Sequence, residues 1–489
     1  MDRQQNSQKN LSAPLPHREG QGESLQYIEL YKQCRTMIHE HSIDAMNAVR
    51  DEAFEHFASA GFPSRKVERY KYTDMQQLFE PDYGLNLNRL TIPVDPYKAF
   101  SCDVPNLSTS LYFVVNDAFY KGEGGKEQVA GSKAQGEKIP QGSGKLPEGV
   151  IVGSLCDYPE LVAKYYAKQA KTDEDAVTAL NTMLAQDGML VYVPKNVKVD
   201  RAIQVINILK SPSLNREGRG GSPFMLNRRV LIVLEEGAEV KILFCDHTAD
   251  DCNFLATQVI EAYVGENASL DLYCMEETHA KNIRISNVYI DQQTNSRVNH
   301  NVITLHNGIT RNRLNLVFSG EGAECSCCGC VIADKQQHVD NNTLIVHHVP
   351  HCTSHELYKY VLDEQAVGAF AGRVLVEKGA QKTTSQMTNQ NLTATKEARM
   401  YTQPMLEIYA DDVKCAHGST VGQLNDAALF YMQQRGISRE EARLLLQNAF
   451  INEVIDEIQL EPLRDRLRYL VEKRFRGELS KCKGCKLCK

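Results

Sequence analysis

The sequence lacks any apolar run of about 18 residues, the length that an α-helix needs to cross a bilayer. Residues 1–25 are polar throughout and contain no apolar core of a secretory signal. Tryptophan is absent, and the net charge of −7 provides no general attraction for nucleic acid or an anionic membrane. These absences predict a soluble, cytoplasmic protein with neither nucleic acid nor membrane as a partner.

Two signatures of catalysis are also missing. Gly142-Ser143-Gly144-Lys145 resembles part of a phosphate-binding loop, but Ile139 replaces its first glycine and Leu146 replaces the Ser or Thr that binds magnesium. No Gly-x-Ser-x-Gly motif of a serine hydrolase occurs. We therefore expect the chain to bind no nucleotide itself and not to be a serine hydrolase of this kind.

Cysteine is abundant, with 15 residues, an odd number that favours reduced thiols over a disulfide framework. The densest group is Cys325, Cys327, Cys328 and Cys330. In a strand the first two cysteines face one side of the sheet and the last two face the other, so the four thiols cannot bind one metal ion together. We therefore expect these cysteines to pack as small apolar side chains in the core.

A second group of cysteines lies at the end of the sequence. Cys482, Cys485 and Cys488 have iron–sulfur spacing but lack the usual fourth thiolate. Neighbouring lysines lower thiol pKa values, so a metal-binding or reactive tail and a frayed tail with adventitious metal binding both remain open.

From about Met189 the sequence consists of short β-rich segments with an internal repeat. A turn-then-strand pattern recurs with marker alanines at Ala238, Ala268, Ala323 and Ala380. The spacings fit a period of about 28 residues, which is typical of a β-solenoid. We predict a mainly β protein in which a β-solenoid lies between helical regions. The expected divisions are a disordered tail (1–25), a helical or mixed region (26–185), the β-helix (186–418) and a C-terminal helical domain (419–489).

The segment from Leu406 to Leu424 shows the alternation of a half-buried strand. Continuing this alternation places Asp411, Val413, Cys415 and His417 on one face, because side chains two apart in a strand point the same way. Gly418 is expected to let the backbone leave the strand. A thiol and an imidazole are thus predicted side by side, although a buried cysteine with a hydrogen-bonded histidine is the simpler alternative.

The residues after Gly422 have helical periodicity. Ser438 and Glu441 form a capping box before a helix whose apolar residues repeat every four positions. We predict that this wide apolar face docks a partner, and a helix hairpin that packs on itself is the alternative. It contains Leu446, Phe450, Val454 and Ile458.

The sequence from Tyr409 to Leu424 closely resembles the C-terminal motif of the SufB/SufD family, which forms the scaffold of the SUF system of iron–sulfur cluster assembly. Gln390 stands where SufB has a cysteine, so the chain resembles the SufD branch. Other segments that resemble family motifs are Glu68–Thr73 (with Tyr70 where a tryptophan is common), Glu356–Lys359, Gly379–Thr383, Thr388–Leu392, Leu429–Tyr431 and Arg435–Ile437.

The resemblance implies a right-handed parallel β-helix between helical N- and C-terminal regions. It also implies a non-catalytic scaffold role. Its implied partners are a SufB-like paralogue, bound through the β-helix, and a SufC-like ABC ATPase, bound to the C-terminal helices; a homodimer is an alternative when the chain is alone. It also implies that Cys415 and His417 take part in holding iron or a transient iron–sulfur cluster at the subunit interface. A purely structural adaptor for the ATPase and a carbohydrate-active enzyme built on a β-helix are the competing hypotheses.

Overall fold

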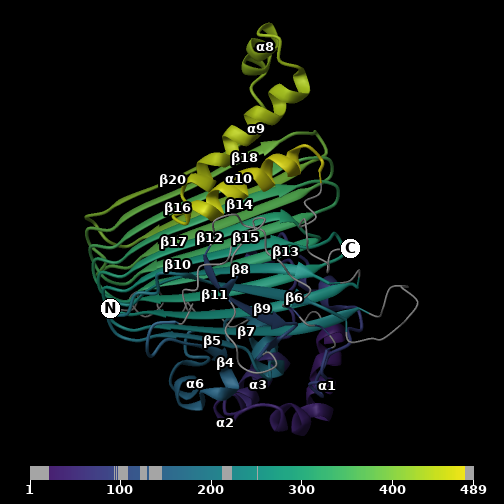
Figure 1. Ribbon diagram of the computed structural model, residues 1–489, viewed down its shortest axis with the longest axis vertical. Coiled ribbons are helices and arrows are strands. Elements are labelled where there is room, and N and C mark those ends of the chain that lie inside the picture. Colours follow the sequence, from purple (N-terminus) through teal and green to yellow (C-terminus); the bar gives the residue numbers. More distant parts are fainter. Residues whose placement is uncertain are drawn as a thin grey trace, which may run out of the picture.

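The computed structural model describes residues 21–92, 94, 96, 108–121, 129–130, 146–211, 223–249 and 252–478. A parallel β-solenoid forms its centre, with helices packed on its outer faces (Figure 1). The prediction of a mainly β, parallel β-helix protein is therefore confirmed. No helix among the described residues is both long and apolar enough to span a membrane.

Successive strands of the solenoid alternate between an 11-stranded and a 9-stranded sheet. The 11-stranded sheet contains, in spatial order, β2 (Ala118–Phe119), β1 (Thr109–Val115), β6 (Ala202–Leu209), β8 (Glu239–Thr248), β10 (Ser269–Glu277), β12 (Arg297–His306), β14 (Glu324–Ala333), β16 (Thr353–Leu362), β18 (Thr384–Thr393) and β20 (Lys414–Gly422), with β3 (Val129–Ala130) paired to β1. The 9-stranded sheet contains β19 (Arg399–Ile408), β17 (Val367–Val376), β15 (His338–His347), β13 (Ile309–Phe318), β11 (Ile283–Gln292), β9 (Phe254–Val264), β7 (Phe224–Leu234), β5 (Met189–Val193) and β4 (Ile151–Ser154).

The repeat turns explain the marker alanines. Gly237, Asn267 and Gly322 have φ values of 67°, 55° and 70°, a conformation that glycine and asparagine adopt most readily. The residue after each of these turns points inward, where only a small side chain fits. All four marker alanines are buried in the core between the two sheets: Ala238, Ala268, Ala323 and Ala380.

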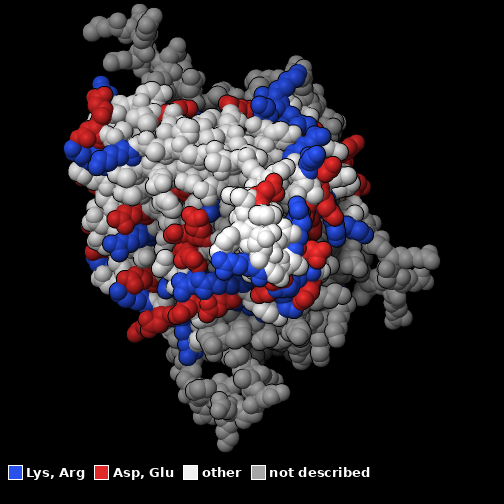
Figure 2. All heavy atoms as spheres, turned by 90° about the horizontal axis from the view of Figure 1, so that it is seen from above, with Lys and Arg blue, Asp and Glu red and all other residues white. Residues whose placement is uncertain are grey.

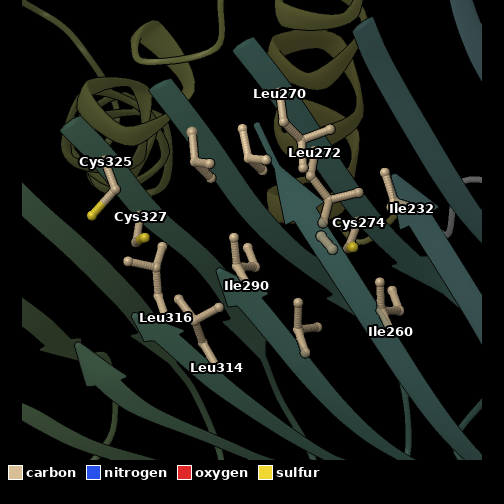
Figure 3. Packing of buried hydrophobic residues seen from close by; sticks show 14 of the residues in the cluster. Ile232, Ile260, Leu270, Leu272, Cys274, Ile290, Leu314, Leu316, Cys325 and Cys327 are labelled. Atoms are coloured by element: carbon tan, nitrogen blue, oxygen red, sulfur yellow. The ribbon is translucent and has the colours of Figure 1, made fainter. Parts of the chain in front are cut away.

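The core between the sheets is built from the inward side chains of successive coils. Figure 3 shows Leu272 and Cys274 of β10 and Cys327 of β14 among isoleucines and leucines of the facing strands. Side-chain hydrogen bonds between neighbouring coils join residues 28 to 31 positions apart, close to the predicted period.

The N-terminal helices cover the outer face of the 9-stranded sheet, where Met225, Leu255 and Ile285 join their apolar core. The helices and short turns of this region are α1 (Gln21–Glu40), α2 (Asp44–Asn47), α3 (Arg50–Ala60), η2 (Glu68–Tyr70), α4 (Met75–Phe79), η3 (Leu155–Asp157), α6 (Pro159–Tyr165) and α7 (Ala176–Leu184).

The predicted disordered tail is wrong for residues 21–25, because α1 begins at Gln21. The backbone N–H of Phe62 donates to the Ser24 hydroxyl over 2.9 Å, and Tyr27 is buried against neighbouring aromatic rings. These contacts come from distant parts of the chain, so the polar local sequence does not reveal them.

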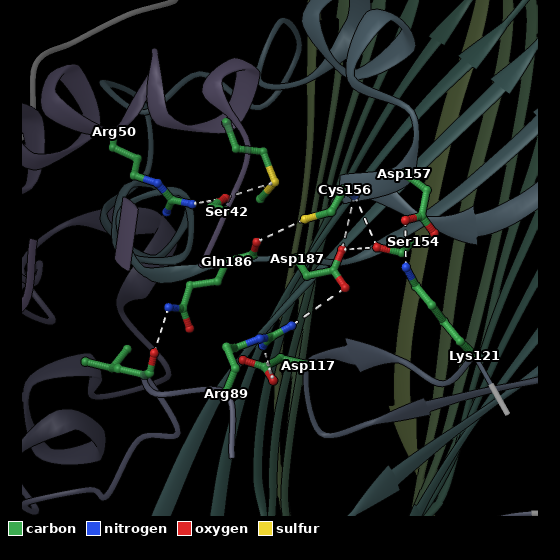
Figure 4. A network of polar contacts seen from close by, with 12 residues as sticks. Ser42, Arg50, Arg89, Asp117, Lys121, Ser154, Cys156, Asp157, Gln186 and Asp187 are labelled. Atoms are coloured by element: carbon green, nitrogen blue, oxygen red, sulfur yellow. Dashed lines mark hydrogen bonds and ion pairs between the residues drawn. The ribbon is translucent and has the colours of Figure 1, made fainter. Parts of the chain in front are cut away.

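A polar network joins the N-terminal region to the first strands of the solenoid (Figure 4). Arg89 forms ion pairs with Asp117 (2.9 Å) and Asp187 (3.6 Å). The backbone N–H of Cys156 donates to the Ser154 hydroxyl over 3.2 Å. Burial and the nearby Asp187 carboxylate raise the pKa of Cys156 to about 12, so this thiol stays protonated and unreactive.

The C-terminal helices are α8 (Asp426–Gln434), α9 (Arg439–Asp456) and α10 (Glu461–Phe475). Ser438 caps α9 by accepting the Glu441 N–H over 3.2 Å, as the capping motif predicts. Helices α9 and α10 lie on the outer face of the 11-stranded sheet, whereas α8 projects beyond the solenoid (Figure 1).

The predicted docking face needs correction. Val454 and Ile458 are buried against the solenoid, and the Lys359 ammonium lies 4.5 Å from the ring centre of the partly buried Phe450. Leu446 is also only partly exposed. Helical periodicity identifies the apolar face of α9 correctly, but the solenoid itself covers much of that face.

Candidate functional site at the open end of the solenoid

The strands that carry the candidate residues lie at the end of the solenoid. β20 is the last strand of the 11-stranded sheet and β19 the last of the 9-stranded sheet, so each has a neighbour on one side only among the strands that the structure describes. The sequence suggests one continuous strand through Cys415, but the chain turns between Ile408 and Lys414 and changes sheet. Gly418 does not end the strand, which continues to Gly422.

Cys415 and His417 share the inner face of β20. Cys415 pairs with Ser385 and His417 pairs with Met387, and both partners are buried inside the solenoid. Cys415 is half-buried and packs against the solenoid core, whereas His417 is exposed because no further coil covers it. Two residues along a strand span about 6.6 Å, so the thiol and the imidazole are neighbours at an open mouth.

The environment of Cys415 sets the protonation state of its thiol. Burial raises the pKa, and a hydrogen bond from the Ser385 backbone offsets part of this rise. The free thiol is therefore protonated at neutral pH, and binding of iron must displace the proton.

The carboxylates next to the site belong to the turn before β20. Asp412 forms an ion pair with Lys382, and its backbone N–H donates to the Gln381 side chain over 2.9 Å. These contacts tie the turn to the preceding coil. Asp412 therefore supports the position of β20 and does not complete a ligand set with Cys415.

Gln390, which the sequence comparison with SufB singles out, lies on the other side of the sheet. It pairs with Lys359 and Thr420 on the neighbouring strands. Gln390 is separated from Met387, whose side chain points into the solenoid core, by an odd number of positions, and residues so separated in a strand lie on opposite faces. Its side chain thus faces outward, away from the mouth that holds Cys415 and His417.

The family-like motif Glu68–Thr73 contacts strand β19 beside the site. The Tyr72 ring stacks on the Tyr401 ring of β19 at a centroid distance of 4.9 Å. The Gln403 side chain donates to the Glu68 carboxylate over 2.7 Å. Sequence reasoning misses these contacts, because no local pattern reports a contact between residues more than 300 positions apart.

Exposed apolar side chains surround this end of the molecule. Tyr401, Ile408, Tyr409 and Val421 are all at least 39% exposed and belong to β19, β20 or the turn between them. Figure 2, the view from above, shows a broad area without Lys, Arg, Asp or Glu. Unpaired edge strands with apolar surface are typical of an interface that another chain covers.

Helix α8 carries a second exposed apolar surface. Phe430 and Tyr431 on α8 are 62% and 59% exposed, and Leu445 at the adjoining part of α9 is 42% exposed. We call these three residues the α8 patch. It contrasts with the side of α9 that is buried against the solenoid.

The four central cysteines behave as the alternation of strand side chains predicts. Cys325 and Cys327 face the inner core, whereas Cys328 and Cys330 face α9 and α10. No group of three His, Cys, Asp or Glu side chains in the described segments already stands in metal-binding geometry. The tail cysteines Cys482, Cys485 and Cys488 lie outside the described residues.

Two models of protein families match long stretches of the chain. The model for the SufBD core domain of SUF-system FeS cluster assembly matches residues 216–450, and the model for the SufBD N-terminal region matches residues 21–205. The chain belongs to the SufB/SufD family of iron–sulfur cluster assembly proteins.

Curated relatives include members named as SufD. The chain is 27% identical over 438 residues to an iron–sulfur cluster assembly SufBD family protein of Synechocystis, covering 86% of this chain and 89% of that protein. It is 33% identical over 173 residues to SufD of Escherichia coli, covering 35% and 41% of the two chains. It is 26% identical over 335 residues to SufD of Bacillus subtilis, covering 67% and 73%.

Proposed function

We propose that this chain is a non-catalytic, SufD-like scaffold subunit that helps to build and transfer iron–sulfur clusters. The observation that carries the proposal is the position of Cys415 and His417 at an open solenoid end with exposed apolar side chains around it. Thiolate and imidazole both bind cluster iron. Because a whole cluster usually takes four protein ligands, two from this chain leave room for ligands from a partner.

The proposed partner at the open end is a SufB-like paralogue. The free edges of β19 and β20 can accept strands from a second β-helix, and the exposed apolar side chains then become buried. In this arrangement the inward face of β20 lies at the junction of the two chains. An incomplete, shared site suits a scaffold, since the cluster must leave again.

The proposed second partner is an ABC-type ATPase that binds the α8 patch. The patch lies on a helix that projects beyond the solenoid, where its exposed aromatic side chains are free to contact another chain (Figure 1). Co-expression with the paralogue and the ATPase, followed by anaerobic affinity purification, tests the assembly. We expect all three chains in one complex. Recovery of this chain alone would contradict the proposal.

Phe430→Asp is expected to abolish co-purification of the ATPase, because it places a charge in the centre of the exposed α8 patch. Tyr469→Asp is the matched control, since Tyr469 is an exposed aromatic residue on α10, outside the patch. Stoichiometry of the purified complex is the measurement. Normal recovery of the ATPase with Phe430→Asp would place the docking site elsewhere.

Replacement of Cys482, Cys485 and Cys488 by serine is expected to leave cluster delivery unchanged. Three thiolates without a fourth do not match the usual ligand set of a cluster. The measurement is the activity of an iron–sulfur enzyme in cells that depend on this chain for assembly. A clear loss of that activity would assign iron or sulfur handling to the tail.

A further inference from the structure

The two strands at the open end turn different main-chain groups toward their free edges. The N–H of Arg399, the first residue of β19, donates to the Ala366 carbonyl over 3.0 Å. The N–H of Tyr409, just after β19, donates to the Val376 carbonyl over 2.9 Å. The N–H groups of a strand point alternately to its two sides. Odd-numbered residues of β19 therefore bond to β17, and even-numbered residues point to the free edge.

Pro404 interrupts the free edge of β19. It lies at an even position opposite Gly372 of β17, so its nitrogen points to the free edge. Proline has no N–H, and its ring occupies the place of the missing hydrogen. A strand that paired along the whole of β19 would therefore meet this ring and leave one of its own carbonyls without a donor. A proline of this kind protects an edge from pairing, so β19 keeps only two short stretches of donors on either side of Pro404.

β20 has a complete row of donors on its free edge. The N–H of Lys414 donates to the Thr383 carbonyl over 2.8 Å, which places the even-numbered N–H groups of β20 on the side of β18. The Thr420 carbonyl agrees with this direction, because it accepts the Asn391 side chain of β18 over 2.8 Å. The odd-numbered N–H groups point to an edge that no described strand covers. They belong to Cys415, His417, Ser419 and Val421.

The side chains of β20 also leave this edge open. Charged residues and proline are common means of protecting an edge strand, and the sequence from Cys415 to Gly422 contains neither. A Cβ placed on Gly418 or Gly422 would meet no described atom within 4 Å. The outward side chains of β19, by contrast, contact the segment Glu68–Thr73. The two edges therefore differ in both main chain and side chains.

We propose that Pro404 is a specificity-determining residue that confines continuous strand pairing at the open end to β20. The inference rests on the proposed function, which assigns this end to a SufB-like paralogue, and it adds which edge that partner uses. The occupant of the β20 edge is the end strand of the partner's β-helix, bound through main-chain hydrogen bonds. β19 contributes side-chain contacts around Tyr401.

An extended strand is the occupant that fits the β20 edge. Its free N–H and C=O groups recur at every second residue, about 6.6 Å apart, and another β-strand matches this spacing. Side chains of a paired strand lie on the same face about 4.8 Å away, so inward residues of the partner strand lie next to Cys415 and His417. The remaining ligands of the proposed cluster site therefore come from the strand that pairs with β20, and not from the chain beside β19.

Hydrogen exchange, resolved to single amides, tests the inference on the full chain alone and in its complex with the paralogue. Complex formation is expected to slow exchange at the edge amides of β20 and to leave exchange at the edge amides of β19 unchanged. The β20 set is Cys415, His417, Ser419 and Val421. The β19 set is Met400, Thr402, Leu406 and Ile408.

Two results would overturn the inference in a complex that forms: slower exchange along the whole β19 set, or unchanged exchange in the β20 set. Failure of the two chains to form a complex would instead contradict the proposed function, and the inference would fall with it. The two failures are therefore distinguished by the recovery of the complex before any exchange is measured.

A matched pair of proline substitutions tests the same point through affinity. The Thr402 and Ser419 hydroxyl oxygens lie 2.6 Å apart across the mouth, and the strands run in opposite directions because a short turn joins them. Met400 and Val421 therefore face each other. Val421→Pro removes an edge donor of β20 and is expected to weaken the complex about tenfold or more, since a carbonyl of the partner strand loses its donor.

Met400→Pro removes an edge donor of β19 and is expected to leave the affinity unchanged. Val421→Ala keeps the N–H and separates the effect of the side chain, and thermal unfolding of each free variant is the folding control. Equal losses of affinity for Met400→Pro and Val421→Pro would show that both edges are paired.

Pro404→Ala is the reciprocal variant, because it completes the row of donors on β19. It is expected to increase self-association at concentrations where the parent chain is monomeric, with slower exchange in the β19 set. Sedimentation and hydrogen exchange are the measurements. An unchanged oligomeric state together with unchanged exchange at β19 would show that Pro404 does not restrict pairing.

Discussion

The isolated chain, reconstituted anaerobically with iron and sulfide, is expected to hold at most a weakly bound cluster at the open end of the solenoid. Cys415 and His417 provide two ligands there, and Gln390 faces the other side of the sheet. The complex with a SufB-like paralogue is expected to hold a stable cluster, because the partner can complete the ligand set. Absorption and Mössbauer spectra of the two preparations measure the difference.

His417→Ala is expected to reduce cluster affinity in the complex at least as strongly as the ~10–100-fold loss that follows removal of an outer-shell partner. It should not dissolve the complex, since the surrounding apolar side chains remain. Thr420→Ala is the matched control, because Thr420 is exposed on the same strand but on its other face. The tail cysteines are replaced by serine throughout, so that they cannot bind iron.

Two outcomes would contradict this arrangement. A stable, stoichiometric cluster on the isolated chain would show that the chain completes a site by itself. Full cluster affinity of His417→Ala in the assembled complex would instead favour the adaptor hypothesis, in which Cys415 and His417 only pack at the interface.

The second large effect is expected for Asp175→Ala, which removes the polar centre between the N-terminal helices and the solenoid. The carboxylate accepts the Val177 and Thr178 N–H groups at the start of α7 and pairs with Arg313 of β13 over 3.0 Å. It also accepts hydrogen bonds from Asn287 and Tyr70. The substitution leaves a buried guanidinium uncompensated, which costs about 3–5 kcal/mol.

The pH dependence of this stabilisation follows from the Asp175 pKa. Burial alone raises it, but Arg313, Arg69 and the Tyr70 hydroxyl outweigh burial and hold it well below the usual range. A carboxylate whose pKa is lower in the folded chain than in the unfolded chain, where it is about 3.9, stabilises the fold at pH values above the unfolded-state pKa. This stabilisation is lost as the pH falls toward the folded-state pKa. The difference in the free energy of unfolding between the parent chain and Asp175→Ala should therefore be constant near neutral pH and become smaller in acid.

Urea unfolding of the two chains measures this effect, and hydrogen exchange in α7 locates it. Asp173→Ala is the control, because Asp173 is exposed in the same loop and surface changes are usually within about 0.5 kcal/mol. Asp175→Asn should fall between parent and Asp175→Ala, since an amide oxygen can still cap α7 but carries no charge toward Arg313. Equal stability of Asp173→Ala and Asp175→Ala would show that the network contributes nothing.

The sequence by itself determined the solenoid, because each coil repeats the same local requirement. A left-handed turn residue at Gly237 or Gly322 is followed by a small inward alanine, and both features leave a mark at a fixed period. It also determined that Cys415 and His417 share a face, and that Cys327 and Cys330 do not, because strand side chains alternate regardless of their surroundings.

Only the tertiary structure decided which surfaces are free. The apolar residues of α9 have the same periodicity whether a partner or the solenoid covers them, and the structure places Val454 and Ile458 against the solenoid while Phe430 stays exposed. The contact of Tyr72 with Tyr401 and the pairing of His417 with Met387 join residues of different coils or regions. Such neighbours depend on the register between strands, which no local pattern in the chain specifies.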